Sequence, residues 1–310
     1  MVRLTKSITG TALLRVCAVL ALVFFGWAAF SAASYASQPV PWEIAMQPPA
    51  TPVKERIQEF HNELLVIITL ITLFVLGLLL YVMVKFNARA HPVPTRTTHN
   101  PVIEVIWTIA PVIILVIVAV PSFKLMYYMD RVPNPDMTIK VTGHQWYWEY
   151  TYPDQGNIDF NSNLIPDDQL KPGQPRLLEV DNPLVVPVGT NVRVQVTGTD
   201  VIHSWFIPSF GVQEYAVVGR LNESWFNVER EGDYYGECNQ ICGVNHAFMP
   251  IKVVAMSKAD FQKWLVDAKK KFAANSPDIE KAPGAPDATL VAAAADVRST
   301  GGAAVPAGNR

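Results

Sequence analysis

Two long apolar segments constrain this chain more than any other feature of its sequence. Residues 64–84 and 105–123 contain no Asp, Glu, Lys or Arg. About 20 such residues in a helix cross the roughly 30 Å hydrocarbon core of a bilayer. A helix also satisfies all of its backbone hydrogen-bonding groups internally, as lipid requires. The two segments therefore predict a transmembrane helix hairpin, with a kink expected at Pro111 in the second span.

The connector between the two spans indicates their orientation. It holds Lys85, Arg89 and Arg96 and no acidic residue. Cytoplasmic loops are enriched in Lys and Arg, so both outer ends of the hairpin are expected outside the cytoplasm. Glu104 begins the second span and has two interpretations. It is either a carboxylate stabilised by the helix N-terminus or a proton-uptake group at membrane depth.

The N-terminal region resembles a secretory signal. Residues 1–36 have a basic start, an apolar run over 17–30 and small residues before position 37. Cleavage after Ala36 is expected, and the alternative is a retained third span. Residues 37–63, proline-rich at their start, are predicted to form an extended arm that leads into the hairpin.

Residues 131–256 show the pattern of an all-β domain that follows the hairpin. Strands are predicted at 138–143, 145–151, 177–180, 190–197, 224–229 and 251–256, separated by turn residues. Ser257 with Asp260 predicts the start of an amphipathic helix within 257–282. Phe261, Trp264, Leu265 and Ala268 share its apolar face. The Ala-, Gly- and Pro-rich residues 283–310 are predicted to be disordered.

A short loop near the end of the β region gathers four metal donors. Cys238, Cys242, His246 and Met249 follow one another within twelve positions. Two thiolates, an imidazole and a thioether suit copper, whereas zinc rarely takes Met. His203 is a more distant candidate for the same site. The alternatives are a Cys238–Cys242 disulfide, a loop histidine and a core methionine, but the four together favour a metal.

The order of these features is similar to that of a known family. Glu104-Val-Ile-Trp107 in the second span precedes Gly143-His-Gln-Trp-Tyr-Trp148. His203 and the loop from Cys238 to Met249 follow. Over roughly residues 55–272 the chain resembles cytochrome c oxidase subunit 2. The resemblance implies an N-terminal two-helix transmembrane hairpin followed by an all-β cupredoxin-like Greek-key domain.

The family also implies the metal ligands. By resemblance Cys238 and Cys242 bridge two copper ions in a binuclear CuA centre. His203 and Met249 complete one copper, and His246 with the carbonyl of Gln240 completes the other. The family has Glu where this chain has Gln240, and that Glu binds Mg²⁺ at the boundary with the catalytic subunit. A neutral amide is a weaker ligand for this hard cation, so Gln240 is kept as a magnesium candidate.

The resemblance also assigns roles in electron and proton transfer. Trp146 matches the tryptophan at which electrons arrive from cytochrome c, with the core-aromatic interpretation left open. Glu104 matches the residue at the mouth of a proton pathway. The implied enzyme is cytochrome c oxidase, in which a haem-bearing catalytic subunit 1, accompanied by other subunits, reduces dioxygen to water and pumps protons. The location implied is a bacterial inner membrane, crossed more than once, with the copper domain in the periplasm.

Charge and the remaining motifs limit the other function classes. Residues 138–256 contain 14 acidic and 7 basic residues. This favours either a solvated surface or the steering of a basic protein partner, and nucleic acid is not expected to bind. Asp168, Asp181 and Asp200 are the candidates for docking. The rival function is a membrane-tethered copper chaperone, which would lack an equivalent of Met249. A quinol oxidase subunit would lack the cysteines, and a nitrous oxide reductase would need another catalytic domain.

Overall fold

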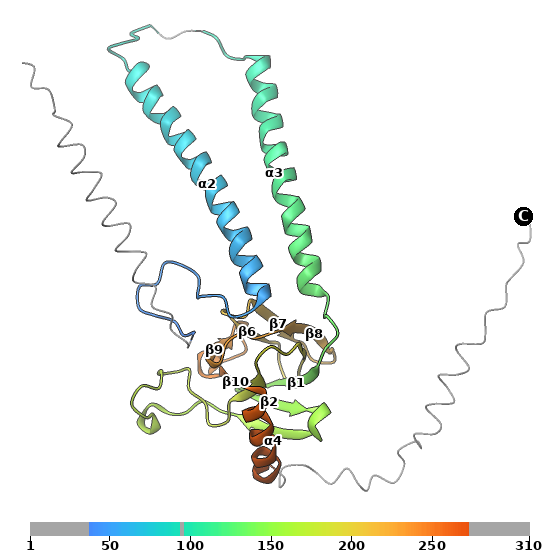
Figure 1. The fold of residues 1–310 in the computed structure, drawn as a ribbon. Coiled ribbons are helices and arrows are strands. Elements are labelled where there is room, and N and C mark those ends of the chain that lie inside the picture. The colour runs from blue at the N-terminus through green and yellow to red at the C-terminus, as the bar shows by residue number, and fades with distance from the viewer. Residues whose placement is uncertain (1–36, 94–95, 273–310) are drawn as a thin grey trace, which may run out of the picture.

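A computed structural model describes residues 37–93 and 96–272. Two long helices, α2 (Pro52–Lys85) and α3 (Pro101–Asp130), stand on one end of a β domain and are joined at their far ends (Figure 1). A third helix, α4 (Lys258–Phe272), lies at the other end of that domain. The predicted signal peptide over 1–36 and the tail over 283–310 lie outside the described residues.

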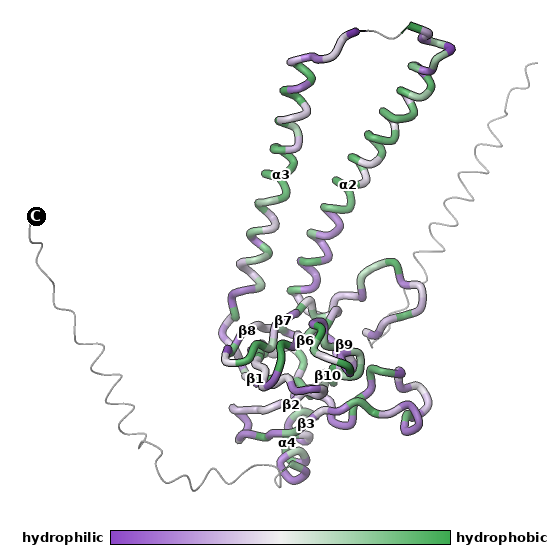
Figure 2. The backbone as a smooth tube through the Cα atoms, turned by 180° about the vertical axis from the view of Figure 1, so that it is seen from behind, coloured by the Kyte–Doolittle hydropathy of each residue, from purple (hydrophilic) through white to green (hydrophobic). Residues whose placement is uncertain are grey.

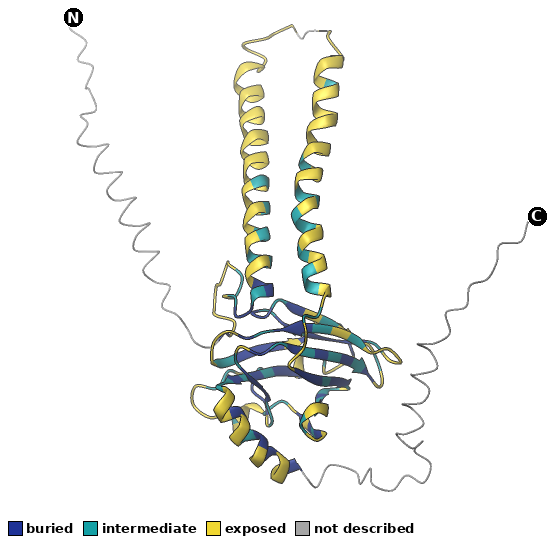
Figure 3. Ribbon diagram, turned by 45° about the vertical axis from the view of Figure 1, so that its right-hand side comes forward, coloured by how far each residue is buried: buried dark blue, intermediate teal, exposed yellow. Residues whose placement is uncertain are grey.

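The two long helices have the length and composition of membrane spans, as predicted. Figure 2 shows apolar residues along both, and Figure 3 shows that most of their surface is exposed. An exposed apolar surface of this extent marks a contact with a membrane or with another protein. Asn100 caps α3 by accepting a hydrogen bond from the Val102 N–H at 3.1 Å. The helix continues through Pro111 and Pro121 without interruption.

The start of α2 corrects one boundary. Residues 52–63, predicted as part of an extended arm, form the first turns of this helix. The physical reason is a strong start signal, since Thr51 caps the helix and Pro52 occupies its first position. Thr51 also donates a hydrogen bond to the Phe210 carbonyl at 2.7 Å. The helix therefore begins against the β domain, before its apolar stretch.

Within the described residues, ten strands form two five-stranded sheets. The first has the order β3-β2-β1-β5-β8 and the second the order β4-β10-β9-β6-β7. Their bounds are β1 Met137–His144, β2 Tyr147–Tyr152, β3 Ile158–Ser162, β4 Leu184–Pro187, β5 Val192–Gly198, β6 His203–Ile207, β7 Val212–Ala216, β8 Asn222–Phe226, β9 Gly232–Cys238 and β10 Pro250–Met256. β1 pairs in parallel with β5 and β4 with β10, and the other pairs are antiparallel. This two-sheet domain confirms the expected cupredoxin-like Greek-key fold.

Five of the six predicted strands overlap observed ones, namely β1, β2, β5, β8 and β10. The predicted strand over 177–180 is absent, because Leu177 has a φ of 65°, a left-handed value that extended strands do not contain. Only an isolated bridge joins Val180 to Leu164. β3, β4, β6, β7 and β9 were not predicted. β4 is the clearest case, since all four of its residues are buried and it shows no alternation.

The core lies between the sheets and extends under α4. Trp148, Trp205 and Phe226 are fully buried there. The predicted helix cap forms, since the Asp260 N–H donates to Ser257 Oγ at 3.1 Å. Phe261, Leu265, Ala268 and Phe272 are its buried face and Trp264 is half-buried, in agreement with the predicted stripe. Residues 273–282 of the predicted helix region lie outside the described residues.

Candidate metal centre

The loop between β9 and β10 carries the four clustered donors. Cys238 ends β9 and Met249 directly precedes β10. The two strands are antiparallel neighbours, with Pro250 opposite Glu237, and the Cys238 N–H donates to the Met249 carbonyl at 3.3 Å. The sheet thus holds both ends of the loop together, and this brings its sulfur and nitrogen donors into one place.

The donor atoms of the loop lie within reach of a common centre. Cys242 Sγ is 3.9 Å from Cys238 Sγ and 3.5 Å from Met249 Sδ. His246 Nδ1 is also 3.5 Å from Cys242 Sγ. Both cysteines are free and buried. Because a disulfide needs sulfurs about 2 Å apart, the alternative of a Cys238–Cys242 disulfide is not realised in this structure.

His203 joins the cluster from a neighbouring strand. It begins β6, which pairs with β9 so that Trp205 lies opposite Cys238. Its ligating atom lies within 4.8 Å of those of both cysteines, and all three residues are buried. The ring packs against β1, where a Cβ added to Gly143 would lie only 2.9 Å from His203 Cδ2. A glycine at this position therefore leaves room for the imidazole.

One nitrogen of His203 is left free for a metal. Nε2 lies 2.9 Å from Asp200 Oδ1 and donates to it, so Nδ1 is the acceptor of the neutral ring. Nδ1 is buried and has no hydrogen-bond partner among the described residues. Buried polar atoms rarely remain unpaired, and a carboxylate behind a histidine is the usual support of a metal ligand. The residues present therefore fit a copper site.

The two thiols have divergent acidities. Burial alone would raise the pKa of Cys238, but the adjacent His203 ring and backbone contacts at Gln240 and Ser204 outweigh it and lower this pKa to about 7. Burial and the negative charge of Cys238 raise the pKa of Cys242 to about 12. In the metal-free pair Cys238 is therefore the first of the two thiols to lose its proton. A cation bound by both sulfurs must displace the second proton.

Gln240 lies between the two cysteines. Its carbonyl oxygen is 3.3 Å from Cys238 Sγ, on the same side as the donor cluster. The residue is half-buried. The main chain at this position is therefore close to the cluster, and its nearness does not depend on whether the side chain is Gln or Glu.

The three neighbouring aromatic residues after β1 occupy different environments. Trp146 is half-buried, and its Nε1 lies 3.3 Å from the Cys242 carbonyl oxygen, to which it donates. Trp148 is fully buried and donates to the Met249 carbonyl at 3.3 Å. Tyr147 stacks on His144, with ring centroids 4.6 Å apart. Trp146 is thus the tryptophan of this pair that reaches both solvent and the metal-binding loop.

Glu104 lies at the other end of the molecule. It is in the first turn of α3, at the end farthest from the β domain (Figure 1). Its Oε1 accepts the Asn100 N–H at 3.0 Å, which caps the helix. This geometry matches the helix-stabilising interpretation of the sequence, and the proton-uptake interpretation remains a prediction.

The three candidate docking carboxylates differ in their surroundings. Asp168 is exposed. Asp181 accepts the Asn163 N–H at 2.7 Å. Asp200 is also exposed, but its carboxylate accepts hydrogen bonds from three donors, the His203 ring and the backbone N–H groups of Val201 and Gln145. Asp200 therefore supports the metal cluster through His203, a role that its sequence context three residues before a ligand could have suggested.

Gln145 is a residue of the site that the sequence interpretation missed. It was placed within a strand, but it lies in the turn between β1 and β2. Its side-chain amide donates to the Cys242 carbonyl at 2.8 Å, across 97 positions of sequence. The separation explains the omission, because local patterns carry no information about such a contact.

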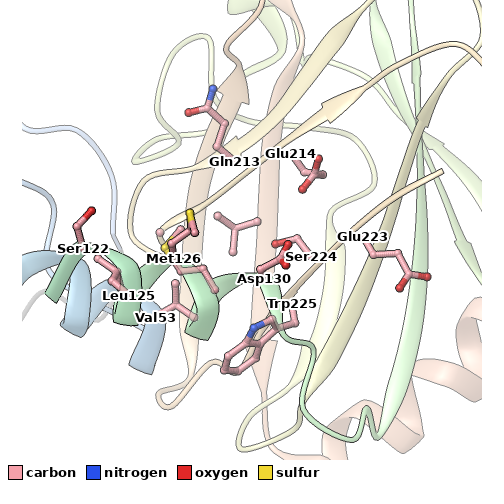
Figure 4. Close-up of a pocket in the computed structure, with 13 residues that line it drawn as sticks. Val53, Ser122, Leu125, Met126, Asp130, Gln213, Glu214, Glu223, Ser224 and Trp225 are labelled. Atoms are coloured by element: carbon pink, nitrogen blue, oxygen red, sulfur yellow. The ribbon is translucent and has the colours of Figure 1, made fainter. Parts of the chain in front are cut away.

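A cleft elsewhere in the chain has no part in the cluster. It has a volume of about 370 Å³ and lies where the end of α3 meets β7 and β8 (Figure 4). Met126, Asp130, Glu214 and Trp225 are among its lining residues. None of the donor residues lines it. The metal cluster lies elsewhere: His203, Cys238, Cys242 and Met249 are buried, whereas His246 is half-buried in a loop that is mostly exposed.

Two family models match the chain. Residues 39–125 match the transmembrane domain of cytochrome c oxidase subunit II, and residues 137–256 match its periplasmic domain. The two matched segments coincide with the helix hairpin and the two-sheet domain described above.

Individual proteins are similar over most of the chain. The probable cytochrome c oxidase subunit 2 of Rickettsia bellii (strain RML369-C) is 51% identical over 254 residues, which are 82% of this chain and 94% of that protein. Cytochrome c oxidase subunit 2 of Oenothera berteroana is 49% identical over 231 residues, 73% of this chain and 90% of that protein. A solved structure, the periplasmic domain of subunit II of cytochrome oxidase of Bradyrhizobium japonicum, has 51% identity and a TM-score of 0.44. It covers 46% of this chain and 99% of its own.

Proposed function

The chain belongs to the cytochrome c oxidase subunit II family, and from this premise we propose that it accepts electrons from cytochrome c at a centre of two copper ions. As a member of this family it is a component of a haem–copper oxidase complex. In the proposed function the electrons pass on to the haem-bearing catalytic subunit, which reduces dioxygen to water and pumps protons. This chain supplies no oxygen chemistry of its own.

The observation that carries the proposal is the free Nδ1 of His203 beside two buried thiols. Nδ1 has no hydrogen-bond partner among the described residues, and the ligating atoms of His203, Cys238 and Cys242 all lie within 4.8 Å of one another. Cys238 and Cys242 would hold both copper ions of the proposed centre. His203 and Met249 would complete the ligands of one ion, and His246 with the Gln240 carbonyl would complete those of the other.

The protein contributes rigidity to this centre. A pair of copper ions held by the same two thiolates would share one electron, which would favour fast electron transfer. The chain's own part is to keep the donors from moving when the charge changes. β6 and β9 fix His203 and Cys238, the β9–β10 pairing fixes Met249, and Asp200 orients His203 through Nε2.

Gln240 has two oxygens with separate proposed roles. The carbonyl oxygen, 3.3 Å from Cys238 Sγ, belongs to the copper site. The side-chain oxygen is the chain's proposed ligand for Mg²⁺ at the boundary with the catalytic subunit. An uncharged amide binds this hard cation more weakly than a carboxylate does, so we expect weaker magnesium binding than in a chain with Glu at this position.

Trp146 is the proposed point at which electrons arrive. Its half-buried indole is hydrogen-bonded to the carbonyl of Cys242, itself a proposed copper ligand. An acidic surface on the same domain, with Asp168 and Asp181 exposed, would attract a basic cytochrome c.

The membrane segment supports the proposed orientation. The connector between α2 and α3 holds Lys85, Arg89 and Arg96, which favours the cytoplasmic side. The β domain, which matches a periplasmic family domain, then lies on the outside of a bacterial inner membrane. Glu104 faces the cytoplasmic side in this arrangement, and we assign it to the mouth of a proton pathway in the complex.

Copper stoichiometry tests the proposal. The purified complex should contain two coppers at this subunit, and electron paramagnetic resonance should show one unpaired electron shared between them. The variant Cys242→Ser should lose that signal. One loosely held copper would instead indicate a copper chaperone, and an absence of copper would reject the proposed electron-transfer role.

A further inference from the structure

The Cys242 carbonyl accepts two hydrogen bonds from adjacent residues of a distant turn. Gln145 Nε2 lies 2.8 Å from this oxygen and Trp146 Nε1 lies 3.3 Å from it. A carbonyl oxygen has two lone pairs, so both donors can bind at once. The bond from the amide is the shorter one, and the indole bond is longer than the usual N–H···O distance. Gln145 therefore makes the stronger of the two links between the turn and the metal-binding loop.

The backbone of Gln145 is fixed as well. Its N–H donates to Asp200 Oδ2 at 2.7 Å. The other oxygen of this carboxylate accepts from His203 Nε2 at 2.9 Å. A chain of hydrogen bonds thus runs from the ring of His203 through Asp200 and Gln145 to the carbonyl of Cys242. The residue that precedes Trp146 is held at two points, its backbone N–H on Asp200 and its side-chain amide on the Cys242 carbonyl.

The metal-binding loop packs closely against the side chains of Trp146 and Gln145. A Cβ added to Gly243 would lie 2.9 Å from Trp146 Cζ2 and 3.1 Å from Gln145 Nε2. Gly243 also has a φ of 130°, which other residues rarely adopt. The indole and the amide therefore rest directly on the main chain of the loop, with the amide packed beside the indole.

We propose that Gln145 is a positioning residue that holds the Trp146 indole on the metal-binding loop. This inference rests on the proposed function, in which electrons arrive at Trp146. Gln145 is itself exposed, so its amide would otherwise bind water. Its inward hydrogen bond gives the turn one orientation relative to Cys242. Without it, the long indole hydrogen bond has to hold the aromatic ring alone.

The first test reads the position of the indole without any electron transfer. Tryptophan fluorescence of the copper-free full chain is compared with that of Trp146→Phe, and the difference is the emission of Trp146. We expect Gln145→Leu to make this emission more accessible to acrylamide quenching. Gln195→Leu is the matched control. Gln195 lies on β5, and its side-chain amide donates a hydrogen bond of similar length, 2.7 Å, to Glu223 on β8. Unchanged quenching in Gln145→Leu would overturn the proposal.

The second test measures electron transfer in the assembled oxidase. A typical hydrogen bond corresponds to about a two- to tenfold change in population. We therefore expect Gln145→Leu to slow reduction of the copper centre at saturating cytochrome c by about that factor. The KM for cytochrome c and the optical spectrum of the copper should stay unchanged. A change in KM alone would make Gln145 a docking contact, and a lost copper spectrum would make it part of the metal site, so either result rejects positioning.

A double-mutant comparison links the effect to Trp146. In the Trp146→Phe background, Gln145→Leu should cause no further slowing, because the side chain that it positions is gone. An equal slowing in both backgrounds would contradict the proposal. If Trp146→Phe alone leaves the rate unchanged, the proposed role of Trp146 fails, while the quenching test still decides whether Gln145 holds the indole.

Discussion

Asp200 Oδ1 lies 2.9 Å from Nε2 of His203, while the opposite nitrogen of the ring, Nδ1, is buried without a hydrogen-bond partner among the described residues. The Asp200 carboxylate could have either of two roles. As a surface acid it would attract a basic partner, whereas as the support of a ligand it orients the imidazole. Its three inward hydrogen bonds favour the second role.

Replacing Asp200 should weaken copper binding. Loss of a carboxylate behind a metal-bound histidine typically costs 10- to 100-fold in affinity, and we expect Asp200→Ala to fall within about that range. Asp200→Asn should be milder, because its amide oxygen can still accept from Nε2. Competition with a copper chelator measures both. Asp168→Ala is the control, and equal affinities for the Asp168 and Asp200 alanine variants would reject the supporting role.

Trp146→Phe should retain copper but accept electrons slowly. Phenylalanine has no N–H to donate to the Cys242 carbonyl, and Trp146 is not among the proposed ligands. We expect reduction of the centre by cytochrome c to slow by at least about tenfold, or roughly 1.4 kcal/mol in activation free energy. Copper analysis and stopped-flow reduction are the measurements. Tyr147→Phe is the control, and turnover equal to wild type would refute the assignment.

Asp168→Lys should slow association with cytochrome c without altering the copper centre. Exposed charges act through long-range attraction, so we expect about a two- to tenfold lower association rate at low salt. The difference should vanish near 1 M salt, where the Debye length is about 3 Å. Asp267→Lys, an exposed reversal on α4, is the comparison. A defect that persists at high salt would argue against electrostatic docking.

Glu104→Gln separates the two interpretations of this carboxylate. Glutamine keeps an oxygen that can accept the Asn100 N–H, so the start of α3 should remain intact. It cannot carry a proton, and we expect turnover of the complex to fall by about tenfold or more if proton uptake passes this group. Oxygen consumption and proton uptake in vesicles measure this. Normal turnover would leave Glu104 as a helix cap alone.

The sequence alone predicts those features whose pattern lies within a single continuous segment. The two spans follow from composition, because an apolar stretch of this length without charged residues is long enough to cross the hydrocarbon core of a bilayer. The donor loop follows from spacing, since Cys238 and Met249 are close enough in sequence for any closed loop to bring them together. The amphipathic face of α4 follows from its period.

The tertiary structure decided the contacts between distant segments. The pairing of β6 with β9 places His203 beside Cys238, and the packing of the β1–β2 turn places Gln145 on the carbonyl of a residue 97 positions away. The inward direction of Asp200 and the left-handed backbone of Leu177 are likewise set by what surrounds them. A sequence records which donors and acceptors exist, but their partners are fixed only when the packed sheets exclude water and favour arrangements in which most buried polar groups are paired.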